Sequence, residues 1–237
     1  SAMLHDSFGR IHDYLRISLT DHCNFRCSYC MPVEEMEWMP QSKLMSAQEI
    51  VKLAQVFVGL GVKKIRLTGG EPLARKEFPE ILEQLSALPV ELTLTTNGVL
   101  IHKHLDALKK ARVRSINLSL DTLQPEKFFK LTRRDQFHQV WDNIQLLLQA
   151  GFRVKLNAVA LHGMIEEEVG DFVQLTEKLP IHVRFIEFMP FSGNHWQSKQ
   201  VVTAAALLEL KQSRFAVVKL DDQQHDTAKK YQVPGYA

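Results

Sequence analysis

Three cysteines lie within eight residues near the start of the chain, as Cys23, Cys27 and Cys30. No other cysteine occurs in the 237 residues, and three cannot make a disulfide framework. Soft thiolates select zinc, copper(I) or iron-sulfur clusters, and the short C-x3-C-x2-C spacing can direct all three at one inorganic centre. An iron-sulfur cluster normally takes four cysteines, so three would leave one iron open for chemistry. The structural alternative is a zinc knuckle completed by His22, although a histidine adjacent to Cys23 is poorly placed for chelation.

A repeated strand-then-helix pattern has to position these cysteines. We predict strands at Tyr14 to Thr20, Lys63 to Thr68, Glu91 to Thr96, Ser115 to Leu120, Arg153 to Ala160 and His182 to Phe188. We predict helices at Ser46 to Leu60, Pro79 to Leu88, His102 to Ala111, Gln136 to Ala150, Glu166 to Leu179 and Thr203 to Gln212. Six such units indicate an α/β fold with a parallel sheet, in the form of a partial (β/α)6 TIM-like barrel. The cysteines follow the first strand, at the strand end where barrel enzymes place their reactive groups.

The predicted strands alternate between apolar and polar residues, which indicates that one face of the sheet is polar. In the first strand, for example, Leu15 and Ile17 oppose Arg16. If helices cover the apolar face, the polar face lines a concave interior where Arg16, Arg66, Lys155 and Arg184 lie close together. Unpaired buried cations are costly, so we expect this interior to hold water or an anionic ligand. The alternative is a half-solvated sheet whose polar face is plain surface.

Composition and charge limit the class of partner. The 29 Lys and Arg against 27 Asp and Glu leave a formal charge of +2, which favours neither a nucleic-acid nor a membrane-surface footprint. No apolar run approaches the roughly 18 residues of a membrane span, and we expect a cytoplasmic protein. Short β-like runs at Phe215 to Leu220 and Lys230 to Val233 predict a C-terminal β-hairpin. We therefore expect a barrel over residues 6–212, with residues 213–237 beginning a further region.

The motifs together carry a resemblance to a known family. The cysteine spacing, with an aromatic residue before the last cysteine, and the Thr68-Gly69-Gly70-Glu71-Pro72 sequence after the next strand resemble the radical S-adenosylmethionine superfamily. Within it, the chain from about Asp6 to Tyr236 is similar to the GTP 3′,8-cyclases of molybdenum cofactor biosynthesis. The motifs that carry this likeness are Leu15 to Cys27, Cys30-Met31-Pro32, Arg66 to Pro72, Thr95 to Gly98, Asn117 to Asp121 and Arg184 to Glu187.

The resemblance implies a role for each matching residue. Cys23, Cys27 and Cys30 would bind one 4Fe-4S cluster, whose fourth iron would take S-adenosylmethionine. The implied contacts of S-adenosylmethionine are Tyr29, Gly70, Ser119 and Met189, and those of GTP are Arg16, Arg66, Thr95 and Lys155. The implied reaction converts GTP to (8S)-3′,8-cyclo-7,8-dihydroguanosine 5′-triphosphate, starting with hydrogen abstraction at the ribose C3′ by a cofactor-derived radical. A one-electron donor protein would be needed.

This chain departs from the family in one respect. The members of the family carry a second cluster on three C-terminal cysteines. No cysteine follows Cys30, so we expect a truncated enzyme that cyclises GTP poorly or not at all, and an open barrel that pairs with a second copy. Two rival functions stay open. One is a different radical S-adenosylmethionine enzyme, such as a peptide-modifying one, and the other is a zinc-binding module.

Overall fold

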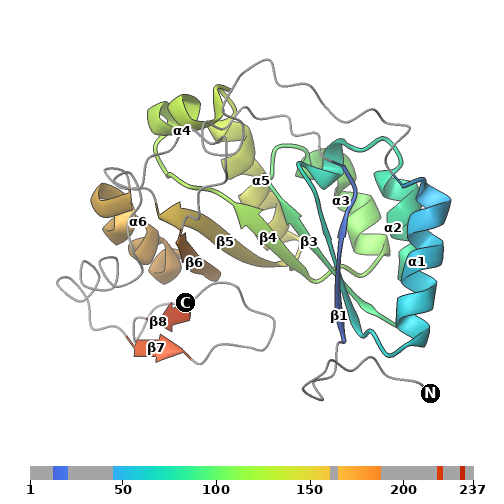
Figure 1. The fold of residues 1–237 in the computed structure, drawn as a ribbon. Coiled ribbons are helices and arrows are strands. Elements are labelled where there is room, and N and C mark those ends of the chain that lie inside the picture. Colours follow the sequence, from blue (N-terminus) through green and yellow to red (C-terminus); the bar gives the residue numbers. More distant parts are fainter. Residues whose placement is uncertain (1–12, 21–44, 161–164, 188–217, 221–229, 233–237) are drawn as a thin grey trace, which may run out of the picture.

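The computed structural model describes residues 13–20, 45–160, 165–187, 218–220 and 230–232, in which strands alternate with helices (Figure 1). The strands of the main sheet are β1 (Tyr14–Ser18), β2 (Lys64–Thr68), β3 (Glu91–Thr96), β4 (Ser115–Ser119), β5 (Arg153–Ala160) and β6 (Ile181–Glu187). The helices are α1 (Ala47–Gly59), the 3-10 turn η2 (Pro72–Ala74), α2 (Phe78–Ser86), α3 (Ile101–Lys110), α4 (Pro125–Thr132), α5 (Phe137–Gln149) and α6 (Ile165–Lys178). None of the helices in this part of the chain is both long enough and apolar enough to cross a membrane.

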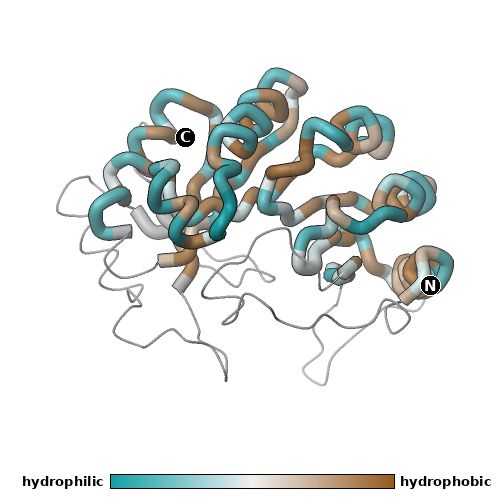
Figure 2. The backbone as a smooth tube through the Cα atoms, turned by 90° about the horizontal axis from the view of Figure 1, so that it is seen from above, coloured by the Kyte–Doolittle hydropathy of each residue, from teal (hydrophilic) through white to brown (hydrophobic). Residues whose placement is uncertain are grey.

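The six strands form one sheet in sequence order, from β1 at one edge to β6 at the other. Every neighbouring pair is parallel. Figure 2 shows the helices in a row along one face of the curved sheet, and none of the helices that the structure describes lies on the other face. The predicted partial barrel with a parallel sheet is therefore confirmed, and the carboxyl ends of all six strands lie on the same side of the sheet.

The core lies between the sheet and the helices. Most of the apolar strand residues predicted to face the helices are buried there, with Ile65, Ile116 and Leu156 all 0% exposed. From the helices, Ile50 of α1 and Phe78 of α2 reach the same core and are also 0% exposed. Ser46 caps α1, because its hydroxyl accepts a hydrogen bond from the Glu49 amide at 3.1 Å.

The sequence prediction differs from the structure in a few elements. It omitted the helix α4 and the turn η2, which are short. The predicted helix at Thr203 to Gln212 lies outside the described residues. Near the C-terminus, β7 (Val218–Leu220) pairs antiparallel with β8 (Lys230–Gln232), so the predicted hairpin pairing is confirmed.

Candidate functional site

The polar side chains of the sheet form rows across the face opposite the described helices. In parallel strands, residues in register share a face, and Thr95, Asn117, Lys155 and His182 are in register from β3 to β6. Toward the carboxyl ends of the strands, Ser119 is in register with Asn157. The alternation in the sequence thus places the polar residues together, as predicted.

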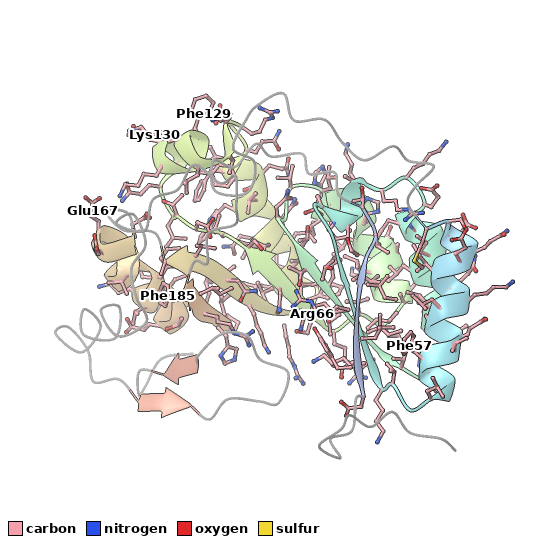
Figure 3. The ribbon with its side chains drawn as sticks, viewed as in Figure 1. Phe57, Arg66, Phe129, Lys130, Glu167 and Phe185 are labelled. Carbon is pink, nitrogen blue, oxygen red and sulfur yellow. The ribbon has the colours of Figure 1, made fainter. Side chains whose placement is uncertain are left out.

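Arg66 lies on the polar face near the β1 edge of the sheet and has neighbours that orient it (Figure 3). Its Nε donates to the Tyr14 hydroxyl at 2.6 Å, and its Nη1 donates to the Thr95 hydroxyl at 3.3 Å. The guanidinium carbon also lies 5.9 Å from the centre of the Tyr14 ring, within cation-π range. Arg16 is in register with Arg66 on the neighbouring strand. These contacts hold a planar cation that can bind an anionic group with two hydrogen bonds.

A second group of cationic side chains lies at the opposite end of the sheet. Lys155 of β5 is in register with His182, and Asn157 with Arg184 of β6. The strands β3 and β4 separate this group from Arg66, and three strand spacings make about 14 Å along the sheet. The structure thus divides the predicted cluster of four cations into two pairs, with Thr and Asn side chains between them.

Unpartnered polar atoms lie on β3 and β4, between the two cationic pairs, and on β5 beside the second pair. Among the described residues, Thr93 Oγ1, Asn117 Oδ1 and Asn157 Oδ1 are buried and have no hydrogen-bond partner. Thr93 is 1% exposed and Asn117 is 5% exposed. An unpaired buried polar group costs about 1–3 kcal/mol, so such a group needs a partner from outside the fold. The arrangement fits a ligand that brings both negative charge and hydrogen-bond donors.

The Gly-Gly-Glu turn after β2 packs directly against the end of β1. A Cβ atom on Gly69 would lie 2.5 Å from the Thr20 carbonyl oxygen, and Gly69 has φ +141°. The amide of Gly70 donates to the same oxygen at 2.7 Å. Gly69 is therefore required by the close approach of β1, independently of any cofactor. Gly70 and Ser119 are both exposed at the carboxyl edge of the sheet, where the resemblance expects S-adenosylmethionine.

Glu71 completes this turn as a fully buried carboxylate. Its Oε1 accepts from the Thr96 hydroxyl at 2.6 Å and from the Leu73 amide at 3.1 Å, and its Oε2 accepts from the Asn97 amide at 2.7 Å. Burial disfavours the charged form and outweighs these three donors, so the pKa of Glu71 rises from 4.5 to about 7. Glu71 thereby ties the turn to the end of β3.

The remaining predicted site residues are not covered by the structure. Cys23, Cys27, Cys30, Tyr29 and Met189 lie outside the described residues. Within the described ranges, no group of three or more His, Cys, Asp or Glu side chains could hold a metal ion.

The structure also adds residues that the sequence analysis did not single out. Thr93, Asn117 and Asn157 lie on the polar face, where the alternation of the strands predicts them. Tyr14 and His182 join that face as well. The same alternation that identified Arg16 and Lys155 could have found them. No comparable signal marks the role of Glu71, because its partners Thr96 and Asn97 are 25 and 26 residues away.

The sequence of this chain is similar to those of known proteins. Residues 17–176 match the Radical SAM superfamily. The whole chain is 48% identical to the mitochondrial GTP 3′,8-cyclase of Arabidopsis thaliana and 46% identical to the human molybdenum cofactor biosynthesis protein 1. It spans 62% of the length of the plant protein and 38% of the length of the human one.

A solved structure shows a similar fold. SuiB of Streptococcus suis bound to S-adenosylmethionine superposes with a TM-score of 0.70, over 85% of this chain and 46% of SuiB. The two sequences are 20% identical over that region, so the likeness concerns the fold alone.

Proposed function

The chain belongs to the radical S-adenosylmethionine superfamily, and from this premise we propose that it is the barrel part of a GTP 3′,8-cyclase. The observation that carries the proposal is the polar face of the sheet, which has cations at both ends and unpartnered polar atoms between them. The similarity of the whole chain to the plant GTP 3′,8-cyclase supports the choice of GTP. We further propose that residues 6–212 make up the barrel and that residues 213–237 begin a separate region.

The superfamily implies S-adenosylmethionine and a 4Fe-4S cluster, and we propose which residues hold them. Cys23, Cys27 and Cys30 would ligate one cluster. Tyr29, Gly70, Ser119 and Met189 would hold S-adenosylmethionine, and the exposed backbone of Gly70 and the Ser119 side chain at the strand ends fit this role. Together the bound groups supply the one-electron chemistry that removes a hydrogen atom from the substrate. A one-electron donor protein would reduce the cluster.

The substrate contacts follow from the charges on the polar face. Arg16, Arg66 and Lys155 would bind GTP, with the triphosphate at the arginine pair, because guanidinium groups make strong hydrogen bonds to phosphate oxygens. Lys155 would contact the nucleotide from the other side of β3 and β4. Thr95 already accepts a hydrogen bond from Arg66, so it would keep that guanidinium oriented beside the ligand. The buried amide oxygen of Asn117 can only accept hydrogen bonds, and a nucleoside offers donors in its ribose hydroxyls and base N–H groups. A nucleoside triphosphate therefore fits this face better than an inorganic polyphosphate does.

The test is to reconstitute the protein anaerobically and reduce it in the presence of S-adenosylmethionine. We expect 5′-deoxyadenosine to form when GTP is added. Cyclised GTP is assayed in the same samples. Formation that depends on a peptide instead would favour the peptide-modifying alternative. Stoichiometric zinc without iron or acid-labile sulfide would favour the zinc module.

Matched charge variants separate the site from general effects of charge. Lys155→Gln removes a cation from the polar face, and Lys110→Gln removes an exposed one from helix α3 on the other side of the sheet. We expect Lys155→Gln to weaken GTP binding about tenfold or more, because a charge-assisted hydrogen bond is lost. Equal affinities for the two variants would contradict the proposed substrate contacts. Light scattering on the same samples tests the expected pairing with a second copy.

A further inference from the structure

Arg75, at the end of the turn that begins with Gly69, binds two segments that are far apart in the sequence. Its Nη1 donates to the Leu19 carbonyl oxygen at 2.7 Å, and its Nη2 donates to the Met45 carbonyl oxygen at 2.8 Å. Leu19 follows strand β1, and Met45 precedes helix α1. A single guanidinium therefore joins the end of a strand to the start of the next helical segment.

These two attachment points flank the part of the sequence that contains every cysteine. Cys23, Cys27 and Cys30 all lie between Leu19 and Met45. The structure describes the chain up to Thr20 and again from Met45 onward. Arg75 thus fixes the two ends of the cysteine-bearing segment relative to each other.

The environment of Arg75 suits this task. Its side chain is only 9% exposed, and its Nε lies 3.5 Å from a carboxylate oxygen of Glu77. The planar guanidinium has five N–H donors in a fixed geometry, so it can bind two carbonyl oxygens and a carboxylate at once. A lysine ammonium at this position is a single point charge on a flexible stem and cannot reproduce that geometry.

The turn that carries Arg75 is itself anchored. The Gly70 amide is bound to Thr20, and the Glu71 carboxylate is bound to Thr96 and Asn97 at the end of β3. Because the turn is fixed, Arg75 holds both ends of the cysteine-bearing segment in place relative to it. The same turn carries Gly70, which is expected to contact S-adenosylmethionine.

We propose that Arg75 is a positioning residue for the iron-sulfur cluster, holding the two ends of the cysteine-bearing segment against the Gly-Gly-Glu turn. This inference rests on the proposed function, in which the three cysteines ligate that cluster. Arg75 has no contact with the reacting groups in this role, and its effect passes through the backbone at Leu19 and Met45.

The test compares Arg75→Gln and Arg75→Lys with Lys76→Gln, a charge removal at the exposed neighbouring residue. Each protein is reconstituted anaerobically, and the release of iron to a chelator is timed. We expect release from Arg75→Gln to be about tenfold faster than from the unaltered chain, since at least one charge-assisted hydrogen bond is lost. The rate of iron release from Arg75→Lys should lie between those of Arg75→Gln and the unaltered chain. The rate from Lys76→Gln should equal that of the unaltered chain.

Electron paramagnetic resonance of the reduced cluster supplies the second readout, with and without S-adenosylmethionine. If the cluster is misplaced, its spectrum should change less when S-adenosylmethionine is added. We expect this smaller change in Arg75→Lys even if its metal-free form unfolds at the same urea concentration as the unaltered chain. If iron release and this spectral change are the same in all four proteins, the inference about Arg75 is wrong while the cluster assignment stands. If the unaltered chain takes up no iron and sulfide, the proposed function fails, and the inference fails with it.

Discussion

Replacing Glu71 by glutamine should remove a pH dependence of stability that the fold builds in. Glu71 is 0% exposed, and burial raises its pKa from 4.5 to about 7. The unfolded chain therefore releases the Glu71 proton at a lower pH than the folded chain does. Between these two pH values the folded state binds more protons, so the free energy of unfolding falls as the pH rises.

The size of the effect follows from the two pKa values. A pKa difference of one unit corresponds to about 1.4 kcal/mol, so the full contribution of Glu71 is about 3 kcal/mol. Between pH 5 and pH 8 the expected loss of stability from this one group is about 2–3 kcal/mol, because part of the change already occurs below pH 5. A glutamine at this position cannot titrate. The free energy of unfolding that is lost with the carboxylate acceptor is therefore the same at every pH.

Urea unfolding of the metal-free chain from pH 5 to pH 8 measures this contribution. The difference in unfolding free energy between the unaltered chain and Glu71→Gln should shrink as the pH rises, because the contributions of other titrating groups cancel. Glu83→Gln, which removes a carboxyl group at an exposed position of helix α2, is measured alongside as the matched control. A difference between the unaltered chain and Glu71→Gln that stays constant within about 0.5 kcal/mol would refute the reasoning.

Further predictions concern the supports of the strand ends. Gly98→Ala should lower the free energy of unfolding by roughly 1–3 kcal/mol, because Gly98 has φ +83° and its added Cβ would lie 2.7 Å from Leu118 Cδ1. In a chain that already carries Leu118→Ala, the further loss caused by Gly98→Ala should be smaller but not zero in urea unfolding, since the backbone strain remains. Asn143→Ala should cost about 1–3 kcal/mol, because its amide donates to the Gly98 and Val99 carbonyl oxygens at 2.7 and 3.0 Å. Gln139→Ala, which removes a neighbour of Asn143 on α5, is the matched control, and equal losses from both variants would contradict the prediction.

Strand alternation was the part of the fold that the sequence expressed most strongly. A period of two places Arg66, Thr95 and Lys155 on one face whatever the details of packing, and the observed register agrees. The helix α4 escaped prediction because its eight residues make barely two turns, too few for an apolar period to stand out. Pro125 at its first turn was the available signal.

Contacts between distant segments could not be derived in the same way. The alternation shows that the cations share a face, but only the strand order shows that β3 and β4 separate Arg66 from Lys155. Likewise, Arg75 binds carbonyl oxygens 56 and 30 residues away, and backbone carbonyls leave no trace in the sequence. The close approach of Thr20 that excludes a side chain at Gly69 is of the same kind.

The most direct test of the central claim, that this protein acts on GTP by radical chemistry, is isotope transfer from the substrate. The reconstituted, reduced protein is mixed with S-adenosylmethionine and with GTP that carries deuterium at the ribose C3′. The proposed function predicts deuterium in the 5′-deoxyadenosine product, and none when Cys23, Cys27 and Cys30 are replaced by alanine. Formation of unlabelled 5′-deoxyadenosine at the same rate with and without GTP would contradict it.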